Sequence, residues 1–204
     1  YYITHALSPL MYITGTVPRE VSCSLLPPKA EGGKNGYVAL VRMSNGAIFR
    51  IFAGVAGHSC AYGMHGTHGA MESVHGHGYF GPQTLRVWHE PWDVREGQCE
   101  DAVYLPNWPS HGDAAEQSGH GGGDLFVALD AYNGIMASNV GIIAWKSAHQ
   151  NGKFLKVPDL KDARDCEEML EDNWTPFEGV ENSRMYPPEM RVHYSIPEDE
   201  IPLA

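Results

Sequence analysis

The sequence contains little cysteine and no long run of apolar residues, and these absences exclude several classes of protein. The cysteines are scattered along the chain, at Cys23, Cys60, Cys99 and Cys166. They form no Cys-x-x-Cys pair, so we expect neither a disulfide framework nor a structural zinc site, and a reducing, cytoplasmic location is the default. No apolar run reaches the roughly 18 residues that span a bilayer, and no signal-peptide pattern opens the chain. We therefore expect a globular protein with no membrane partner.

Clustered positive charge is also missing. The 14 Lys and Arg residues stand against 25 Asp and Glu residues, which gives a formal net charge of −11. A nucleic-acid-binding face needs clustered Lys and Arg, so we expect no nucleic-acid partner. The acidic residues concentrate in 159–172 and 198–200, and we interpret these runs as solvated surface. A nucleophile elbow, a P-loop and an HExxH motif are absent as well, and Ser8 and Ser147 have no recognisable catalytic partner pattern.

The spacing of apolar residues predicts an α+β fold. Helical spacing occurs in four segments: 2–14, 123–136, 140–151 and 163–170. Strand-like runs occur in six: 20–26, 36–43, 47–55, 58–65, 69–74 and 84–90. Several antiparallel strands followed by helices are typical of an open sheet with helices on one face.

Three local signals refine this prediction. Asn45-Gly46 lies between two strand-like runs and predicts a hairpin. Pro9 lies inside the first helix and predicts a kink or a break, and Gly15 predicts a left-handed cap at its end. With 43% hydrophobic residues, the chain is expected to form one domain over 1–204, in which 173–204 wraps the surface as an extended tail.

The most ordered segment of the sequence begins with the glycine-rich turn GHGGGD, residues 119–124. Glycines of this kind cradle phosphates when they follow a buried strand. The preceding residues, 106–117, are polar and contain two prolines, so they predict a loop instead. We therefore expect a helix entry carrying His120, whose neutral imidazole can contact a hydroxyl group. Asp124 is expected to cap that helix or to reach a substrate.

Closely spaced histidines between 58 and 77 raise the possibility of a metal site. They form an HxxH pair and an HxH pair within the set His58, His65, His68, His75 and His77. No acidic or cysteine ligand stands at a familiar offset, and the density of glycine suggests loops. We therefore predict no metal and expect this region to line a cleft or a subunit contact. A metalloprotein remains an alternative.

The segment 119–159 resembles the C-terminal region of the Gfo/Idh/MocA oxidoreductases, and it is most similar to members with a GHGG turn, including NAD-dependent glycosidases. Three further segments match: Tyr1 to Pro9 (YYITHALSP), Ser44 to Arg50 (SNGAIFR) and Tyr62 to Glu72 (YGMHGTHGAME). The resemblance implies an open, mainly antiparallel sheet with helices packed on one face. It also implies a homo-oligomer that associates through the sheet face.

Two features of that family are missing from this sequence, namely the N-terminal Rossmann domain and the Glu-Lys-Pro segment. The chain also lacks an initiator methionine, so we expect it to be the C-terminal substrate-binding and oligomerisation part of a longer protein. The resemblance then implies that NAD or NADP binds the Rossmann domain of the intact protein. No cofactor is expected to bind this fragment stably.

The resemblance assigns roles to five residues. His5 matches the family's active-site histidine and is the expected catalytic acid/base, since imidazole can accept a hydroxyl proton near neutral pH. Thr4, Tyr1, His120 and Asp124 are expected to bind substrate. Many relatives have an aspartate where this chain has Tyr1, a difference that favours the glycosidase-like branch.

The expected function of the intact protein is hydride transfer between a nicotinamide and a carbon of a sugar or cyclitol. One alternative is a glycosidase that oxidises its sugar transiently and then eliminates the glycosidic substituent. A second alternative, from a different class, is a non-catalytic carbohydrate-binding or assembly module. A dinucleotide fingerprint encoded upstream would distinguish the enzymes from the module.

Overall fold

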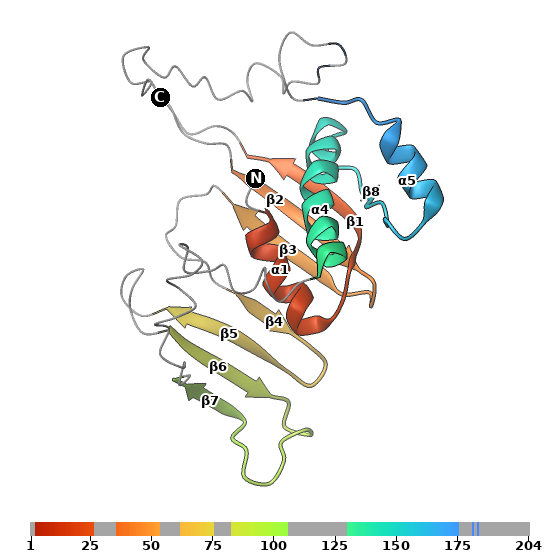
Figure 1. Ribbon diagram of the computed structural model, residues 1–204. Coiled ribbons are helices and arrows are strands. Elements are labelled where there is room, and N and C mark those ends of the chain that lie inside the picture. Colours follow the sequence, from red (N-terminus) through yellow and green to blue (C-terminus); the bar gives the residue numbers. More distant parts are fainter. Residues whose placement is uncertain are drawn as a thin grey trace, which may run out of the picture. The chain divides into compact units, whose positions relative to one another are not determined.

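The computed structural model describes residues 3–26, 36–53, 62–75, 83–105, 130–175, 181 and 183 of the chain. These residues belong to two compact units, one formed by 1–55 with 118–204 and the other by 56–117. The elements of each unit are labelled in Figure 1. The two units are described separately below.

The first unit contains a four-stranded antiparallel sheet in the order β3-β2-β1-β8. Its strands are β1 (Pro18–Leu25), β2 (Tyr37–Met43), β3 (Ile48–Ala53) and β8 (Leu155–Lys156). The hairpin predicted from Asn45-Gly46 is confirmed, because β2 and β3 pair directly across this turn and Gly46 has a φ of +85°. The two-residue strand β8 was not predicted, since its pattern is too short to be distinctive.

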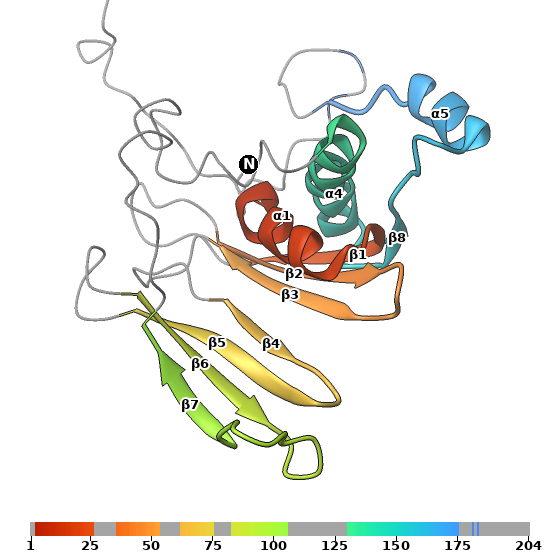
Figure 2. The ribbon, with the colours of Figure 1, turned by 60° about the horizontal axis from the view of Figure 1, so that its bottom comes forward.

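Helices α1 (Ile3–Thr14) and α4 (Ala131–His149) lie on one face of this sheet, as Figure 2 shows. Their apolar stripes and the inward side chains of the strands form the core. The fully buried members with the largest side chains are Leu7, Met136, Val21, Val41, Val140 and Val157. A third helix, α5 (Ala163–Leu170), was predicted with the same bounds. The α+β class with helices on one face of an antiparallel sheet is confirmed.

Residues 131–149 form the single helix α4, whereas the sequence predicted two helices, over 123–136 and 140–151. The predicted interruption between 136 and 140 therefore does not exist. Helix α4 begins after its extended N-cap Asp130, which accepts a hydrogen bond from the Asn133 N–H at 2.8 Å. Residues 123–129 of the first predicted helix lie outside the described residues. Ala137 and Asn139, within the predicted interruption, are buried in the structure. Tertiary packing therefore outweighs the weak helix propensity of this stretch.

Helix α1 is not broken at Pro9. The helix runs from Ile3 to Thr14 and ends at Gly15, which has a φ of +62° and donates to the Met11 carbonyl at 2.8 Å. A proline removes one helical hydrogen bond. The buried stripe of Ile3, Leu7 and Met11 holds the helix against the core on both sides of the missing hydrogen bond.

Two glycines of α4 provide a matched test of this helix packing. A Cβ at Gly141 would lie 3.1 Å from Ile3 Cγ2 of α1, whereas a Cβ at Gly134 has no atom within 4 Å. We expect Gly141→Leu to lower the free energy of unfolding by about 2 kcal/mol, because α1 must move away. Gly134→Leu should raise it by about 0.5 kcal/mol through helix propensity. Urea unfolding of both variants measures this, and equal stabilities would contradict the packing.

The second unit contains a separate four-stranded antiparallel sheet in the order β4-β5-β6-β7. The strands are β4 (Gly63–His65), β5 (Gly69–His75), β6 (Gln83–His89) and β7 (Asp101–Tyr104). The predicted pairing across residues 66–68 is confirmed. Strand β7 was missed because it is short and follows a polar loop. None of the fully buried apolar side chains that the structure describes lies between 56 and 117.

None of the helices in the described segments is both long enough and apolar enough to span a bilayer.

Candidate functional site

The N-terminal half of α1 carries the predicted catalytic histidine. His5 is exposed and Thr4 is half-buried, while Ile3 and Leu7 on the opposite side of the helix are buried. The close approach of Ile3 to Gly141 fixes this end of α1 against α4. The His5 side chain therefore lies at the surface, on a backbone that the core holds in place.

The structure describes two of the five predicted site residues, Thr4 and His5, which are neighbours in sequence on α1. Tyr1, His120 and Asp124 lie outside the described residues. The N-cap of α4 is Asp130, whereas the predicted helix entry at Asp124 lies outside the described residues, so the role expected of Asp124 stays a prediction.

Two neighbours of His5 were not predicted as site residues. Tyr12 is 54% exposed and follows His5 by two helical turns, so both side chains lie on the same side of α1. Ser8 is buried, and within the described residues its Oγ has no hydrogen-bond partner. The helical periodicity of α1 was sufficient to place Tyr12 on the same side of the helix as His5. The burial of Ser8 depends on the elements packed against α1, so the sequence of α1 alone does not reveal it.

A hydrogen-bonded carboxylate, Asp159, joins the start of α4 to the sheet. Asp159 accepts hydrogen bonds from Tyr132 Oη at 2.7 Å, from Arg19 Nη1 at 2.7 Å and from the Lys161 N–H at 3.0 Å. These interactions, with the Tyr132 hydrogen bond the largest, lower the pKa of Asp159 to about 2. Burial and the same hydrogen bond raise the pKa of Tyr132 to about 12. The network therefore ties α4 to β1 as a fixed platform.

This network predicts a pH-dependent stability. Because the pKa of Asp159 is lower in the folded chain than the 3.8 of an unperturbed aspartate, its contribution is present above about pH 4 and is lost as pH falls toward 2. We expect Tyr132→Phe to lose about 1 kcal/mol at neutral pH, since the hydroxyl donor disappears while the ring contact with Lys161 remains. The difference in free energy of unfolding between the parent and Tyr132→Phe should become smaller as the pH falls toward 2.

Chemical unfolding of the parent and of Tyr132→Phe across this pH range measures the effect. Tyr12→Phe is the matched control, because Tyr12 is exposed and should change stability little at any pH. A difference between parent and Tyr132→Phe that does not depend on pH would contradict the coupling to Asp159.

Three other potentially reactive side chains in the described residues, Cys23, Ser147 and His68, are buried or engaged in structural contacts. Burial raises the pKa of the Cys23 thiol to about 11, so the nucleophilic thiolate is disfavoured. Ser147 is structural, because its Oγ accepts from the Cys23 N–H at 2.9 Å and donates to the Lys153 carbonyl at 2.7 Å. His68, from the predicted histidine cluster, pairs with Asp93 at 3.2 Å. Among the described residues no three His, Cys, Asp or Glu side chains gather as a metal site requires.

The described residues do not fit a dinucleotide. Such a cofactor is held by a glycine-rich turn between a parallel strand and a helix N-terminus. All strand pairs described in the two sheets are antiparallel. The N-termini of α4 and α5 are already capped by the carboxylates of Asp130 and Asp162, which repel phosphate. A nicotinamide would therefore have to be bound by other residues.

Comparison with known proteins gives a match in structure only. The sequence matches no protein-family model and no curated protein. The fold is similar to the aldose-aldose oxidoreductase from Caulobacter crescentus complexed with glycerol, with a TM-score of 0.52 and 18% identity over 75% of this chain and 45% of that one. At 18% identity this similarity concerns the fold alone.

Two further solved structures match with lower scores. The transcriptional regulator Gal80p from Kluyveromyces lactis has a TM-score of 0.46 and 14% identity over 76% of this chain and 44% of that one. The NAD-binding protein from Listeria innocua has a TM-score of 0.44 and 15% identity over 75% of this chain and 45% of that one. The chain thus spans less than half the length of each solved structure that it resembles.

Proposed function

We propose that this chain is the substrate-binding part of a Gfo/Idh/MocA-like oxidoreductase that transfers hydride between a nicotinamide and a carbon of a sugar or cyclitol. The observation that carries the proposal is the combination of this fold with an exposed histidine, His5, on a helix fixed in the core. The chain corresponds to less than half of the matched aldose-aldose oxidoreductase, so the activity is proposed for a longer protein.

His5 is the proposed acid/base of the reaction. Oxidation of an alcohol removes a hydride from carbon and a proton from oxygen, and the nicotinamide is the chemical group that takes the hydride. The imidazole of His5 would accept the hydroxyl proton and return it in the reverse direction. Thr4, next to His5 and half-buried, would hold a neighbouring hydroxyl group by a hydrogen bond.

Sequencing the gene upstream of the Tyr1 codon is the first test. A glycine-rich dinucleotide fingerprint in frame supports the proposal, whereas a natural start at Tyr1 would overturn the enzyme assignment for this chain. The full-length protein is then assayed with aldoses and cyclitols by nicotinamide absorbance. Stable formation of reduced nicotinamide indicates a dehydrogenase. Cleavage of a glycoside without net reduction indicates the glycosidase reaction, and neither activity in a protein that binds sugar indicates a binding module.

We also propose that the intact protein is a homo-oligomer that associates through the open face of the β3-β2-β1-β8 sheet. The helices cover the opposite face of this sheet (Figure 2). Alternation along β3 places Ile48 and Phe52 on the open face, where they are 60% and 53% exposed. Exposed apolar side chains on a sheet face are typical of an interaction surface. A two-fold interface would pair this face with the same face of a second copy.

Phe52→Glu tests this interface. A charge placed in a two-fold contact meets its own copy, so we expect the dimer dissociation constant to rise at least about 10-fold. Analytical ultracentrifugation of the full-length protein measures the constant. Leu170→Glu on α5 is the matched control, because Leu170 is 87% exposed but lies outside the sheet. Equal effects of the two substitutions would contradict the proposed face.

A further inference from the structure

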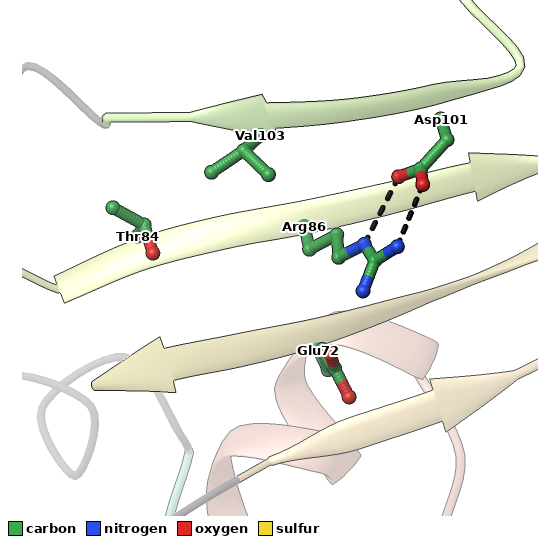
Figure 3. Close-up of a pocket in the computed structure, with 5 residues that line it drawn as sticks. All are labelled: Glu72, Thr84, Arg86, Asp101 and Val103. Carbon is green, nitrogen blue, oxygen red and sulfur yellow. Dashed lines mark hydrogen bonds and ion pairs between the residues drawn. The ribbon is translucent and has the colours of Figure 1, made fainter. Parts of the chain in front are cut away.

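One face of the second sheet carries a polar depression. The depression has a volume of about 380 Å³ and is lined by Glu72, Thr84, Arg86, Asp101 and Val103. Figure 3 shows these side chains on three neighbouring strands. The register places Glu72 opposite Arg86 across β5 and β6, and Val103 opposite Arg86 across β6 and β7. The volume lies within the roughly 300–1,000 Å³ typical of small-molecule pockets.

The guanidinium group of Arg86 is held rigidly at the centre of this depression. Asp101 accepts two hydrogen bonds from it, from Nε at 3.0 Å and from Nη2 at 2.7 Å. The guanidinium also stacks over the Trp88 ring, with Cζ 4.3 Å from the ring centroid. A bidentate carboxylate and an aromatic ring together fix both the plane and the position of the group. Arg86 Nη1 has no part in either hydrogen bond, and its donors remain available to a ligand.

Glu72 supplies acceptors on the other side of Arg86. Glu72 is a half-buried residue, and Figure 3 marks no hydrogen bond between its carboxylate and the other residues drawn. The carboxylate oxygens can therefore accept hydrogen bonds from a ligand beside the fixed donors of Arg86, and Val103 and the Thr84 methyl group provide an apolar end.

The charges decide which ligands fit. An anion would approach Arg86 but would be repelled by Glu72 and Asp101, whose carboxylates already compensate the guanidinium. A cation would approach Glu72 but would be repelled by Arg86. A neutral ligand that offers several hydroxyl groups can donate to Glu72 and accept from Arg86 at the same time. An apolar C–H side on that ligand would match Val103.

We propose that this depression, to which α1 contributes no lining residue, binds a neutral polyhydroxylated ring, such as a pyranose or a cyclitol. The inference does not depend on the proposed oxidoreductase activity, because it involves no nicotinamide and no residue of α1. Binding here would hold a hydroxylated ligand on the second sheet whether or not the protein is an enzyme.

Titration of the ¹⁵N-labelled chain tests this site by NMR, with methyl β-glucopyranoside and myo-inositol as the neutral probes. Sodium acetate and methylammonium are the charged probes, each used up to about 50 mM so that millimolar affinity is detected. We expect saturable shifts of the amides of residues 72, 84, 86 and 101 with at least one neutral probe. Shifts with the charged probes alone, or no saturable shifts, would overturn the proposal.

Glu72→Leu should weaken binding of the neutral probe at least about 10-fold, because the carboxylate acceptors are lost. Glu20→Leu is the matched control. Glu20 lies opposite an arginine that stacks on an aromatic ring, Arg42, as Glu72 lies opposite Arg86, but Glu20 is on the other sheet and its carboxylate is already paired with that arginine. If Glu72→Leu loses its dispersed amide signals, Glu72→Gln keeps the side-chain size and should weaken binding several-fold. Undiminished affinity in a folded Glu72 variant would overturn the assignment, and His5→Gln should bind as the parent does.

Discussion

Replacing His5 by glutamine in the full-length protein should lower kcat by a factor of about 10² to 10⁴. Glutamine can hydrogen-bond a substrate hydroxyl but cannot accept its proton, so the substitution removes the proposed proton acceptor and retains a polar contact. His5 is exposed on α1, so the free energy of unfolding should change by less than about 0.5 kcal/mol. A large kinetic effect without a loss of stability is the signature expected of a catalytic group.

Two further variants separate catalysis from positioning. Thr4→Val should raise KM more than it lowers kcat, because Thr4 is proposed to hold a hydroxyl group and not to transfer its proton. Ile13→Gln is the control for α1 itself, since Ile13 is 56% exposed and has no proposed role. Steady-state kinetics and thermal unfolding of the three variants give the comparison. If kcat of His5→Gln stays within about threefold of the parent, His5 is not the acid/base.

Several elements were predictable because their signals are local. The β2–β3 hairpin follows from Asn45-Gly46, since few other dipeptides favour the required turn. Helix α5 follows from an N-cap aspartate, Asp162, which accepts from the Arg164 N–H at 2.9 Å. The end of α1 follows from Gly15. In each case the deciding interaction lies within a few residues of the signal.

The wrong predictions concern features that depend on distant residues. The continuity of α4 through Asn139 reflects burial against other elements, among them Met169 of α5, whose sulfur lies 3.8 Å from Asn139 Nδ2. The polar depression on the second sheet also could not be predicted, because the Arg86–Asp101 pair requires the register between β6 and β7. The alternation of side chains along β6 identifies the sheet face on which Arg86 lies, but it does not identify the residue on β7 that pairs with Arg86. Sequence patterns therefore predicted elements better than the contacts between them.

Gly69→Ala should destabilise the second sheet by about 4 kcal/mol. A Cβ at Gly69 would lie 2.0 Å from the Trp88 carbonyl oxygen and 3.1 Å from His89 Cα, and the residue has a φ of +154°. These atoms belong to the backbone of β6 and cannot rotate away as a side chain can. Overpacking and a disfavoured backbone conformation each cost about 1–3 kcal/mol, so the β5–β6 ladder must open at this end.

Amide hydrogen exchange can localise this effect. The second unit contributes no fully buried apolar side chain among the described residues, so a loss of this size should exceed its local stability. Protection should fall across β5 and β6 while the amides of α4 and β2 keep theirs. Gly66→Ala is the control in the same turn, because its Cβ would lie 3.6 Å from the Gly69 carbonyl oxygen, an ordinary contact.

The same substitution connects the strand ladder to the proposed ligand site. The Trp88 ring stacks against the Arg86 guanidinium, and the backbone of Trp88 would be displaced in Gly69→Ala. This substitution should therefore also abolish binding of the neutral probes. Gly66→Ala should leave that binding intact. If Gly69→Ala keeps both its protection from exchange and its probe affinity, the close approach of β5 to β6 at this position is wrong, and the rigid support of Arg86 loses its basis.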